Sequence, residues 1–136
     1  MQYKVIISNA KHTFPIKGLN ELLGAMYWNP RLKKFQNEVK AENDKKCRLA
    51  IQKYMRGIKI DKPIQCHFYI YAQDKKHDRG NVYTATEKSF LDALQQKKVI
   101  ANDTFDLVLD STFHTDLDRC NPRIEVIIEE VEANNE

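Results

Sequence analysis

The sequence has little of what marks the specialised protein classes. Its 136 residues include only four glycines and four prolines and no repetitive tract, which excludes a collagenous or linker-dominated chain. Three widely spaced cysteines without a Cys-x-x-Cys pair indicate free thiols rather than a disulfide framework or a zinc ribbon. No window approaches the roughly 18 apolar residues of a membrane span, and the first residues lack a secretory signal. We therefore expect a cytoplasmic protein with no membrane association.

What is present favours one globular unit. An apolar content of 42% in a chain of this length supplies a single core, so we expect residues 1–136 to form one domain. The formal net charge of +3 is too small to establish nucleic-acid binding unless positive charge gathers on one surface.

Period-two alternation of apolar and polar residues predicts four strands. A first strand has Tyr3, Val5 and Ile7 on one side, and the clearest alternation runs over residues 64–72. Two more strands are predicted over residues 105–109 and 124–131, with a polar segment containing a turn between them. The acidic tail from Glu129 is expected to fray.

Helical spacing and capping signals predict three helices. A short helix runs over residues 20–27, and Asn29 followed by Pro30 starts a long one that Gly57 stops, about 28 residues and about 42 Å long. The pattern does not decide whether the long helix is interrupted near residues 43–44. A third helix covers residues 81–96. The fold class is therefore α/β (α+β): a small mixed β-sheet packed against the long helix and the third, motif-bearing helix.

The chemistry-bearing residues gather between positions 75 and 106. At 100° per residue, Asn81, Lys88 and Asp92 share one face of the third helix, whose start lies beside Asp78. The chain becomes acidic again at Asp103 and Asp106, so we expect two sets of carboxylates to converge.

Converging carboxylates beside a lysine suit a Mg²⁺ phosphodiesterase site. Magnesium prefers oxygen ligands, lowers the pKa of a bound water and neutralises charge on the scissile phosphate, and lysine adds a positive point charge. The plain alternative is that Lys88 and Asp92 form a surface i,i+4 pair and that Asp78 and Asp103 are ordinary loop carboxylates.

Three motifs carry a resemblance to a known family. His-Asp-Arg-Gly-Asn at 77–81, Lys-Ser-Phe-Leu-Asp-Ala-Leu at 88–94 and Val-Ile-Ala-Asn-Asp at 99–103 resemble the core of the RusA family of Holliday junction resolvases, which occurs largely in phages and prophages. The segment at 17–22 before the long basic helix also resembles phage members. The resemblance implies a protein encoded by a phage or prophage and acting in the bacterial cell.

The resemblance also implies roles for individual residues. Asp78 and Asp103 take the places of metal-binding aspartates, Lys88 that of the catalytic lysine, and Asn81 that of the motif asparagine. The implied activity is Mg²⁺-dependent, structure-selective endonuclease cleavage that resolves four-way DNA junctions by paired symmetric nicks. A homodimer is implied too, because a twofold junction calls for two identical sites.

The sequence departs from the family pattern at three points. Gly80 stands where a second aspartate is usual, Asn102 replaces the first member of an acidic pair, and Lys88 follows Asn81 by four residues more than in the shortest pattern. Asp74, Asp92 or Asp106 are candidates for the missing carboxylate, and we favour Asp106 as a metal ligand. A catalytically weakened, junction-binding accessory protein is the alternative function, and a general nucleic-acid binding domain is a third.

Basic residues supply candidate DNA contacts. Lys75, Lys76, His77 and Arg79 flank Asp78, and we assign DNA binding to Lys75, Lys76, Arg79 and Asn81. Basic residues also crowd the long helix; the alternative there is a solvated face balanced by Glu38, Glu42 and Asp44.

Two further features have plain alternatives. His114, Asp116, Asp118 and Cys120 would face one way in an extended segment, as in a transition-metal site, but a polar turn produces this spacing readily. Tyr27 and Trp28 suit stacking on unpaired bases, although such a pair beside a helix start more often anchors a core or an interface.

Overall fold

The computed structural model describes residues 1–9, 13–17, 30–75 and 79–132. Its elements follow in the order β1 (Gln2–Ile7), α2 (Pro30–Tyr54), β2 (Ile64–Ala72), α3 (Arg79–Gln96), β3 (Val108–Leu117) and β4 (Arg123–Glu130). Within these ranges, neither helix has the length and apolar character needed to cross a membrane.

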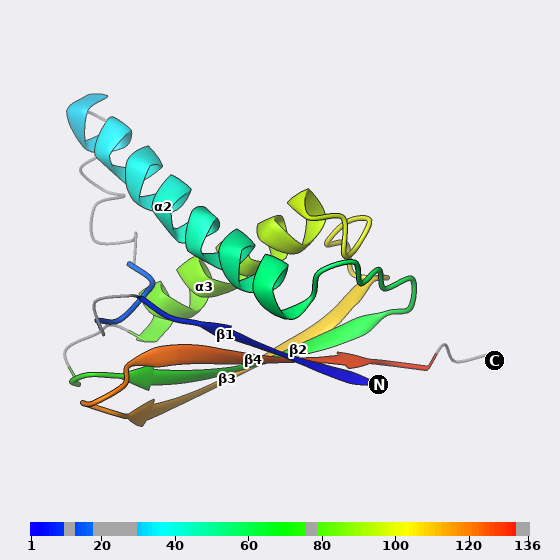
Figure 1. The fold of residues 1–136 in the computed structure, drawn as a ribbon. Helices are drawn as coiled ribbons and strands as arrows, with labels where there is room; N and C mark the ends of the chain where they lie inside the picture. The colour runs from blue at the N-terminus through cyan, green and yellow to red at the C-terminus, as the bar shows by residue number, and fades with distance from the viewer. Residues whose placement is uncertain (10–12, 18–29, 76–78, 133–136) are drawn as a thin grey trace.

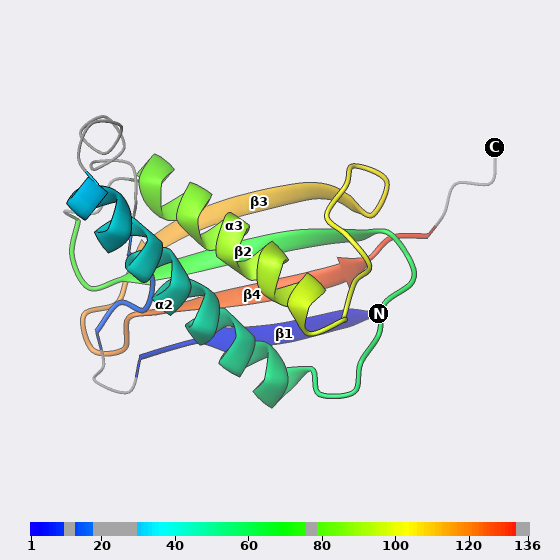
Figure 2. The same cartoon turned by 90° about the horizontal axis from the view of Figure 1, so that it is seen from above.

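The four strands form one mixed sheet in the order β1-β4-β2-β3 (Figure 1). β4 pairs antiparallel with both of its neighbours, whereas β2 and β3 are parallel. A parallel pair needs a crossover connection, and α3 supplies it. Both helices cover the same face of the sheet (Figure 2). The expected α/β class, with a small mixed sheet against two helices, is therefore confirmed.

The core lies between the sheet and the two helices. In β2 the odd-numbered side chains are half-buried and the even-numbered ones are fully buried, which is the alternation that the sequence predicted. Phe68 sits at the centre, with its ring edge-on to Phe90 at 5.7 Å and stacked on Phe113 at 5.1 Å between centroids. The core thus joins β2, α3 and β3.

α2 is continuous through residues 43–44, so the break left open by the sequence is absent. Asn43 is buried, and its side chain forms two hydrogen bonds with the backbone of Lys17. Nδ2 of Asn43 donates to the Lys17 carbonyl at 2.9 Å, and Oδ1 accepts from the Lys17 backbone N–H at 3.1 Å. Gly57 follows the helix with φ of 76°, a left-handed conformation that favours glycine, and this confirms the predicted stop.

β3 is where the sequence-based prediction was wrong. The predicted strand at 105–109 overlaps only its start, and the supposed polar turn forms most of the strand, up to Leu117. β3 is an edge strand, and Ser111 and Thr115 are polar although they share a face of the strand with Phe113, so the alternation is weak. The helix predicted at 81–96 begins two residues earlier, at Arg79. The helix predicted at 20–27 lies outside the described residues.

Candidate functional site

The motif-bearing segment lies where β2 ends and α3 begins. Lys75 follows β2 with an exposed side chain, and Asn81 is half-buried in the first turn of α3. Asp78 and Lys76 belong to positions 76–78, which lie outside the described residues, as does the side chain of Arg79. The described part of the predicted DNA-binding segment therefore lies at the carboxyl-terminal end of β2.

Lys88 projects from the middle of α3, where it contacts Asp92 one turn further on. Its Nζ lies 3.4 Å from Oδ1 of Asp92, and the lysine side chain is 61% exposed. This is the plain i,i+4 pair that the spacing allowed. The same lysine remains accessible to a phosphate, because an exposed pair of this kind holds its partners weakly.

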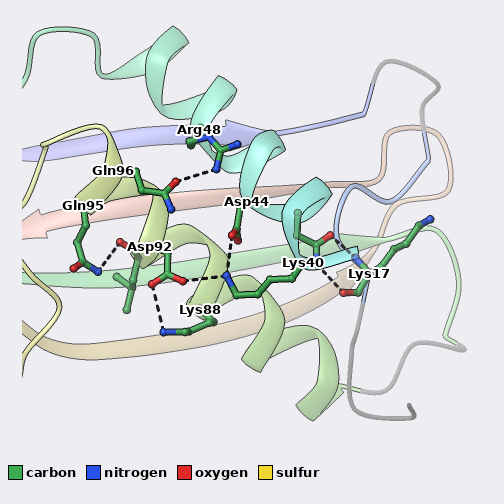
Figure 3. Close-up of polar contacts among 10 residues, drawn as sticks. Lys17, Lys40, Asp44, Arg48, Lys88, Asp92, Gln95 and Gln96 are labelled. Atoms are coloured by element: carbon green, nitrogen blue, oxygen red, sulfur yellow. Dashed lines mark hydrogen bonds and ion pairs between the residues drawn. The ribbon is translucent and has the colours of Figure 1, made fainter. Parts of the chain in front are cut away.

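Asp92 belongs to a contact between the two helices (Figure 3). Lys40 of α2 places its Nζ 3.2 Å from Oδ2 of Asp92 and 2.8 Å from Oδ2 of Asp44. Burial opposes the charge on Lys40, but the hydrogen bonds to these two carboxylates raise its pKa. Asp92 therefore serves helix packing, which makes it a poor substitute for the aspartate missing at Gly80.

The downstream acidic site is a tight turn before β3. The carbonyl of Thr104 accepts the amides of Leu107 and Val108 at 3.0 and 2.9 Å. The Thr104 amide donates to Oδ1 of Asn102 at 3.1 Å, and its hydroxyl bonds the carboxylate of Asp106. Asp103 is exposed on this turn. Asn102 and Asp106 thus hold the turn together, and Asp103 is presented to solvent.

The first turn of α3 and the turn that carries Asp103 lie at opposite ends of that helix. α3 has 18 residues and is therefore about 27 Å long. The helix starts above the carboxyl ends of β2 and β3, and the turn that carries Asp103 follows its far end (Figure 2). A single chain thus does not bring Asp103 or Asp106 to the first turn of α3, so the expected convergence is not met within one copy.

The second possible metal site is not assembled either. His114 and Asp116 do share the open face of β3, but the ring of His114 stacks on Tyr69 at 5.0 Å. Asp118 instead accepts hydrogen bonds from the backbone amides of Cys120 and Asn121. Its Oδ2 also forms an ion pair with Nη1 of Arg123, 2.9 Å away. Throughout the described ranges, no three His, Cys, Asp or Glu side chains lie close enough to hold a metal ion.

A cluster of cations sits where the carboxyl ends of α2 and α3 meet; we call it the basic surface. Arg48 donates to Oε1 of Gln96 at 2.9 Å, and Lys97 donates to Oε1 of Gln52 at 3.1 Å, so both link the two helices. Lys59 and Lys98 line one open hollow beside them, with Asp61 as the carboxylate in its lining. The basic surface thus consists of Arg48, Lys59, Lys97 and Lys98.

The basic surface has four cations and one nearby carboxylate, Asp61, so it carries a surplus of positive charge. None of the ion pairs among the described residues involves these four side chains, and the partners of Arg48 and Lys97 are neutral amides. Lys97 and Lys98 directly follow the carboxyl terminus of α3, where the helix dipole favours positive charge. Stability alone would explain that position, but the surplus positive charge is also available to an anionic partner.

Sequence reasoning noted that basic residues crowd the long helix but did not single out Lys97 or Lys98. A usable signal was present, since no acidic residue occurs from position 45 to position 60. The acidic residues that seemed to balance the helix all lie in its first part, and Asp44 is already paired with Lys40.

Comparison with known proteins adds no assignment. No protein-family model matches the chain, and no curated protein matches its sequence.

Proposed function

We propose that this chain binds branched DNA through the basic surface, and that it acts as a Mg²⁺-dependent endonuclease on four-way junctions when two copies assemble. The observation that carries the proposal is the set of cations whose partners are neutral glutamine amides. The nuclease part rests on the resemblance of the motif segment and of Lys88 and Asp103 to the RusA family.

Phosphate groups are the natural partners of such a surface. Each phosphate that a lysine or arginine neutralises releases condensed counterions, which drives binding and makes it salt-dependent. Arg48 donates from a planar guanidinium, which matches phosphate oxygens in a bidentate manner. The glutamine amides orient Arg48 and Lys97 without cancelling their charge.

The residues of one chain do not fit a complete magnesium site. The resemblance assigns the metal to Asp78 and Asp103. Asp78 precedes the first residue of α3 in the sequence, whereas Asp103 follows the last turn of the same helix. Gly80 has no side chain to contribute. Hard divalent ions need several oxygen ligands at one point, so a nuclease centre requires carboxylates from two copies.

The same separation favours a second candidate, a junction-binding accessory protein without cleavage activity. It would keep the basic surface and a dimeric form while lacking a metal centre. Gly80, in place of the family aspartate, supports this reading.

The binding part is tested by the salt dependence of affinity for a labelled four-way junction. We expect the double variant Arg48→Gln with Lys97→Gln to bind more weakly. The slope of log affinity against log salt concentration should decrease by the amount that corresponds to about two phosphate contacts. Lys62→Gln is the matched control, because Lys62 already pairs with a carboxylate: its Nζ lies 3.2 Å from Oε1 of Glu132. Equal effects of both changes would contradict the assignment.

The cleavage part is tested with a four-way junction and a matched linear duplex, each with Mg²⁺ or with EDTA. The proposal expects paired, metal-dependent nicks in the junction, lost in Asp103→Asn while junction binding persists. Binding without nicks supports the accessory candidate, and equal weak binding to both DNAs supports the general binding domain.

A further inference from the structure

The open hollow beside the basic surface combines an apolar wall with charged groups. Its volume is about 440 Å³, within the range of roughly 300 to 1,000 Å³ that is typical of small-molecule sites. Lys59 and Lys98 add positive charge, and Asp61 and Gln95 add side-chain oxygens that accept hydrogen bonds. The apolar residues of the lining are Ile60, Val99, Ile100, Ala101 and Leu107. The hollow therefore suits a ligand with an apolar part and an anionic part.

Backbone hydrogen bonds join the two sides of the hollow. The amide of Ile60 donates to the carbonyl of Val99 at 2.8 Å, and the amide of Val99 donates to the carbonyl of Leu94 at 2.9 Å. The segment that precedes β2 is thus attached to the end of α3. Because these bonds exist before any ligand arrives, binding does not have to order the walls of the hollow.

Lys98 adopts a backbone conformation that favours glycine. Its φ is 59°, in the left-handed region, and its amide donates to the carbonyl of Gln95 at 2.9 Å just beyond the end of α3. Glycine would end the helix here without steric strain. Backbone strain concentrates at binding sites, and Lys98 lines the hollow, so the strain points to a use of the lysine side chain.

Phe105 lies on the turn that borders the hollow. The turn joins Ala101 to Leu107, both of which line the hollow, and Phe105 itself is 94% exposed. The carbonyl and the side chain of Thr104 make the hydrogen bonds of the turn, so the phenylalanine stands on a fixed support. A ring exposed to this degree contributes little to the core, whereas exposed aromatic rings are platforms on which unpaired bases stack.

We propose that the hollow binds one unpaired nucleotide of a DNA strand, with the base between Phe105 and the apolar lining and the flanking phosphates on Lys59 and Lys98. The choice of DNA rests on the proposed function, whereas the selection of an unpaired base rests on the ring, the hollow and the two lysines. Asp61 and Gln95 then accept hydrogen bonds from the N–H groups on the edge of the base. A paired base has both its faces and this edge already engaged, so a regular duplex does not enter the hollow.

Strands with and without bases test the stacking. The probe is a short fluorescein-labelled oligothymidylate, and its counterpart is an abasic strand with the same number of phosphates. Both are titrated in EDTA, so metal chemistry does not contribute. We expect Phe105→Ala to weaken binding of the oligothymidylate by about tenfold, as the loss of one base–aromatic stack implies, and to leave binding of the abasic strand unchanged.

Two further variants serve as controls for this experiment. Phe105→Tyr keeps an aromatic ring and should restore most of the affinity. Leu49→Ala shortens another exposed apolar side chain, on α2, and should have no effect. An equal loss for the two strands in Phe105→Ala, an equal loss in Leu49→Ala, or a wild-type protein that does not bind the oligothymidylate would overturn the proposal.

Lys98→Gly separates ligand binding from stability of the fold. Glycine relieves the left-handed strain, so the urea midpoint of unfolding should rise. Affinity for the oligothymidylate should nevertheless fall several-fold, and its salt dependence should decrease by about one phosphate contact. A lysine with only a structural role would not move the two quantities in opposite directions. Unchanged affinity in this variant would contradict the role of Lys98.

The four-way junction separates failure of this inference from failure of the proposed function. Salt-dependent junction binding together with equal effects of Phe105→Ala on the two strands would remove the nucleotide site and leave the proposed function standing. Base-dependent binding of the oligothymidylate without preference for the junction over a linear duplex would do the reverse. Thymidine monophosphate is added as a competitor. Full competition at a concentration equal to that of the strand would assign the hollow to free nucleotides and overturn its assignment to a strand.

Discussion

Lys40 of α2 and Asp92 of α3 form an ion pair, with Nζ and Oδ2 3.2 Å apart, that joins the two helices covering the sheet. Lys88 contacts the other oxygen of the same carboxylate, Oδ1, from the solvent side. Asp92 thus pairs with Lys40, which joins the two helices, and with Lys88, which is exposed to solvent. This difference separates the stability of the fold from the proposed chemistry at Lys88.

We expect Asp92→Asn to destabilise the protein by about 1 kcal/mol, because the pair between the helices is partly buried, whereas an exposed pair contributes less. Lys88→Gln should change stability by less than about 0.5 kcal/mol but abolish junction nicking. Urea denaturation measures the first quantity and a nicking assay the second. The assignment fails if Lys88→Gln lowers stability as much as Asp92→Asn does.

Acid sensitivity should centre on Arg123. Hydrogen bonds from the amide of Asn121 and from Arg123 lower the pKa of Asp118. Burial opposes ionisation of Glu125, but hydrogen bonds from Lys4 and Arg123 lower its pKa as well. Carboxylates with lowered pKa values stabilise the folded protein above their unfolded pKa of about 4, and this contribution disappears as the pH falls through the folded value.

Arg123→Gln should therefore lower stability at pH 7 and flatten its loss below about pH 4. Denaturation midpoints of both proteins between pH 7 and pH 2 measure the effect. Arg119→Gln is a matched control on the same turn, since Arg119 is exposed. Parallel pH curves for wild type and Arg123→Gln would rule out the role of this cluster.

Thiol reactivity should distinguish the cysteines. Burial raises the pKa values of Cys47 and Cys66 to about 12, whereas Cys120 is exposed. Because only the thiolate reacts, Ellman's reagent at pH 8 should titrate one thiol per native chain and all of them after unfolding. Cys120→Ser should leave none reactive in the native protein. Rapid reaction of a second native thiol would show that the core opens.

Mixed dimers test whether a metal centre is shared between copies. Asp78→Asn and Asp103→Asn are each expected to be inactive alone. A dimer that combines them has one site with both changes and one with neither, so co-refolded mixtures should give single nicks rather than paired ones. A site contained in one chain would give no nicks in the mixture, and this result would contradict the shared centre even if each parent dimerises.

The sequence specified the interior of the fold better than its edge. β2 was predicted with its observed bounds because both of its neighbours and the helices above it enforce alternation. β3 was largely missed because Ser111 and Thr115 are polar although they share a face of the strand with Phe113, so apolar and polar residues do not alternate clearly. The continuity of α2 through Asn43 depends on the backbone of Lys17, 26 residues away, which local patterns do not reveal.

The sequence identified the residues of the candidate site but did not predict how they are arranged in space. Asp103 follows the motif closely in sequence, and proximity along the chain suggested proximity in space. A parallel pair of strands carries the chain back to the other end of the sheet before the second strand begins, however, so the residues at the two ends of α3 separate. Only the topology of β2, α3 and β3 reveals this.

The position of β4 between β1 and β2 also constrains how the molecule forms. β1 has β4 as its strand neighbour, so the first of the four described strands to be synthesised has no strand to pair with until the last of the four is made. A nascent chain halted before Arg123 can close the crossover of β2, α3 and β3 but leaves Val5 and Ile7 without a neighbouring strand. The sheet is therefore completed only when β4 takes its place between β1 and β2.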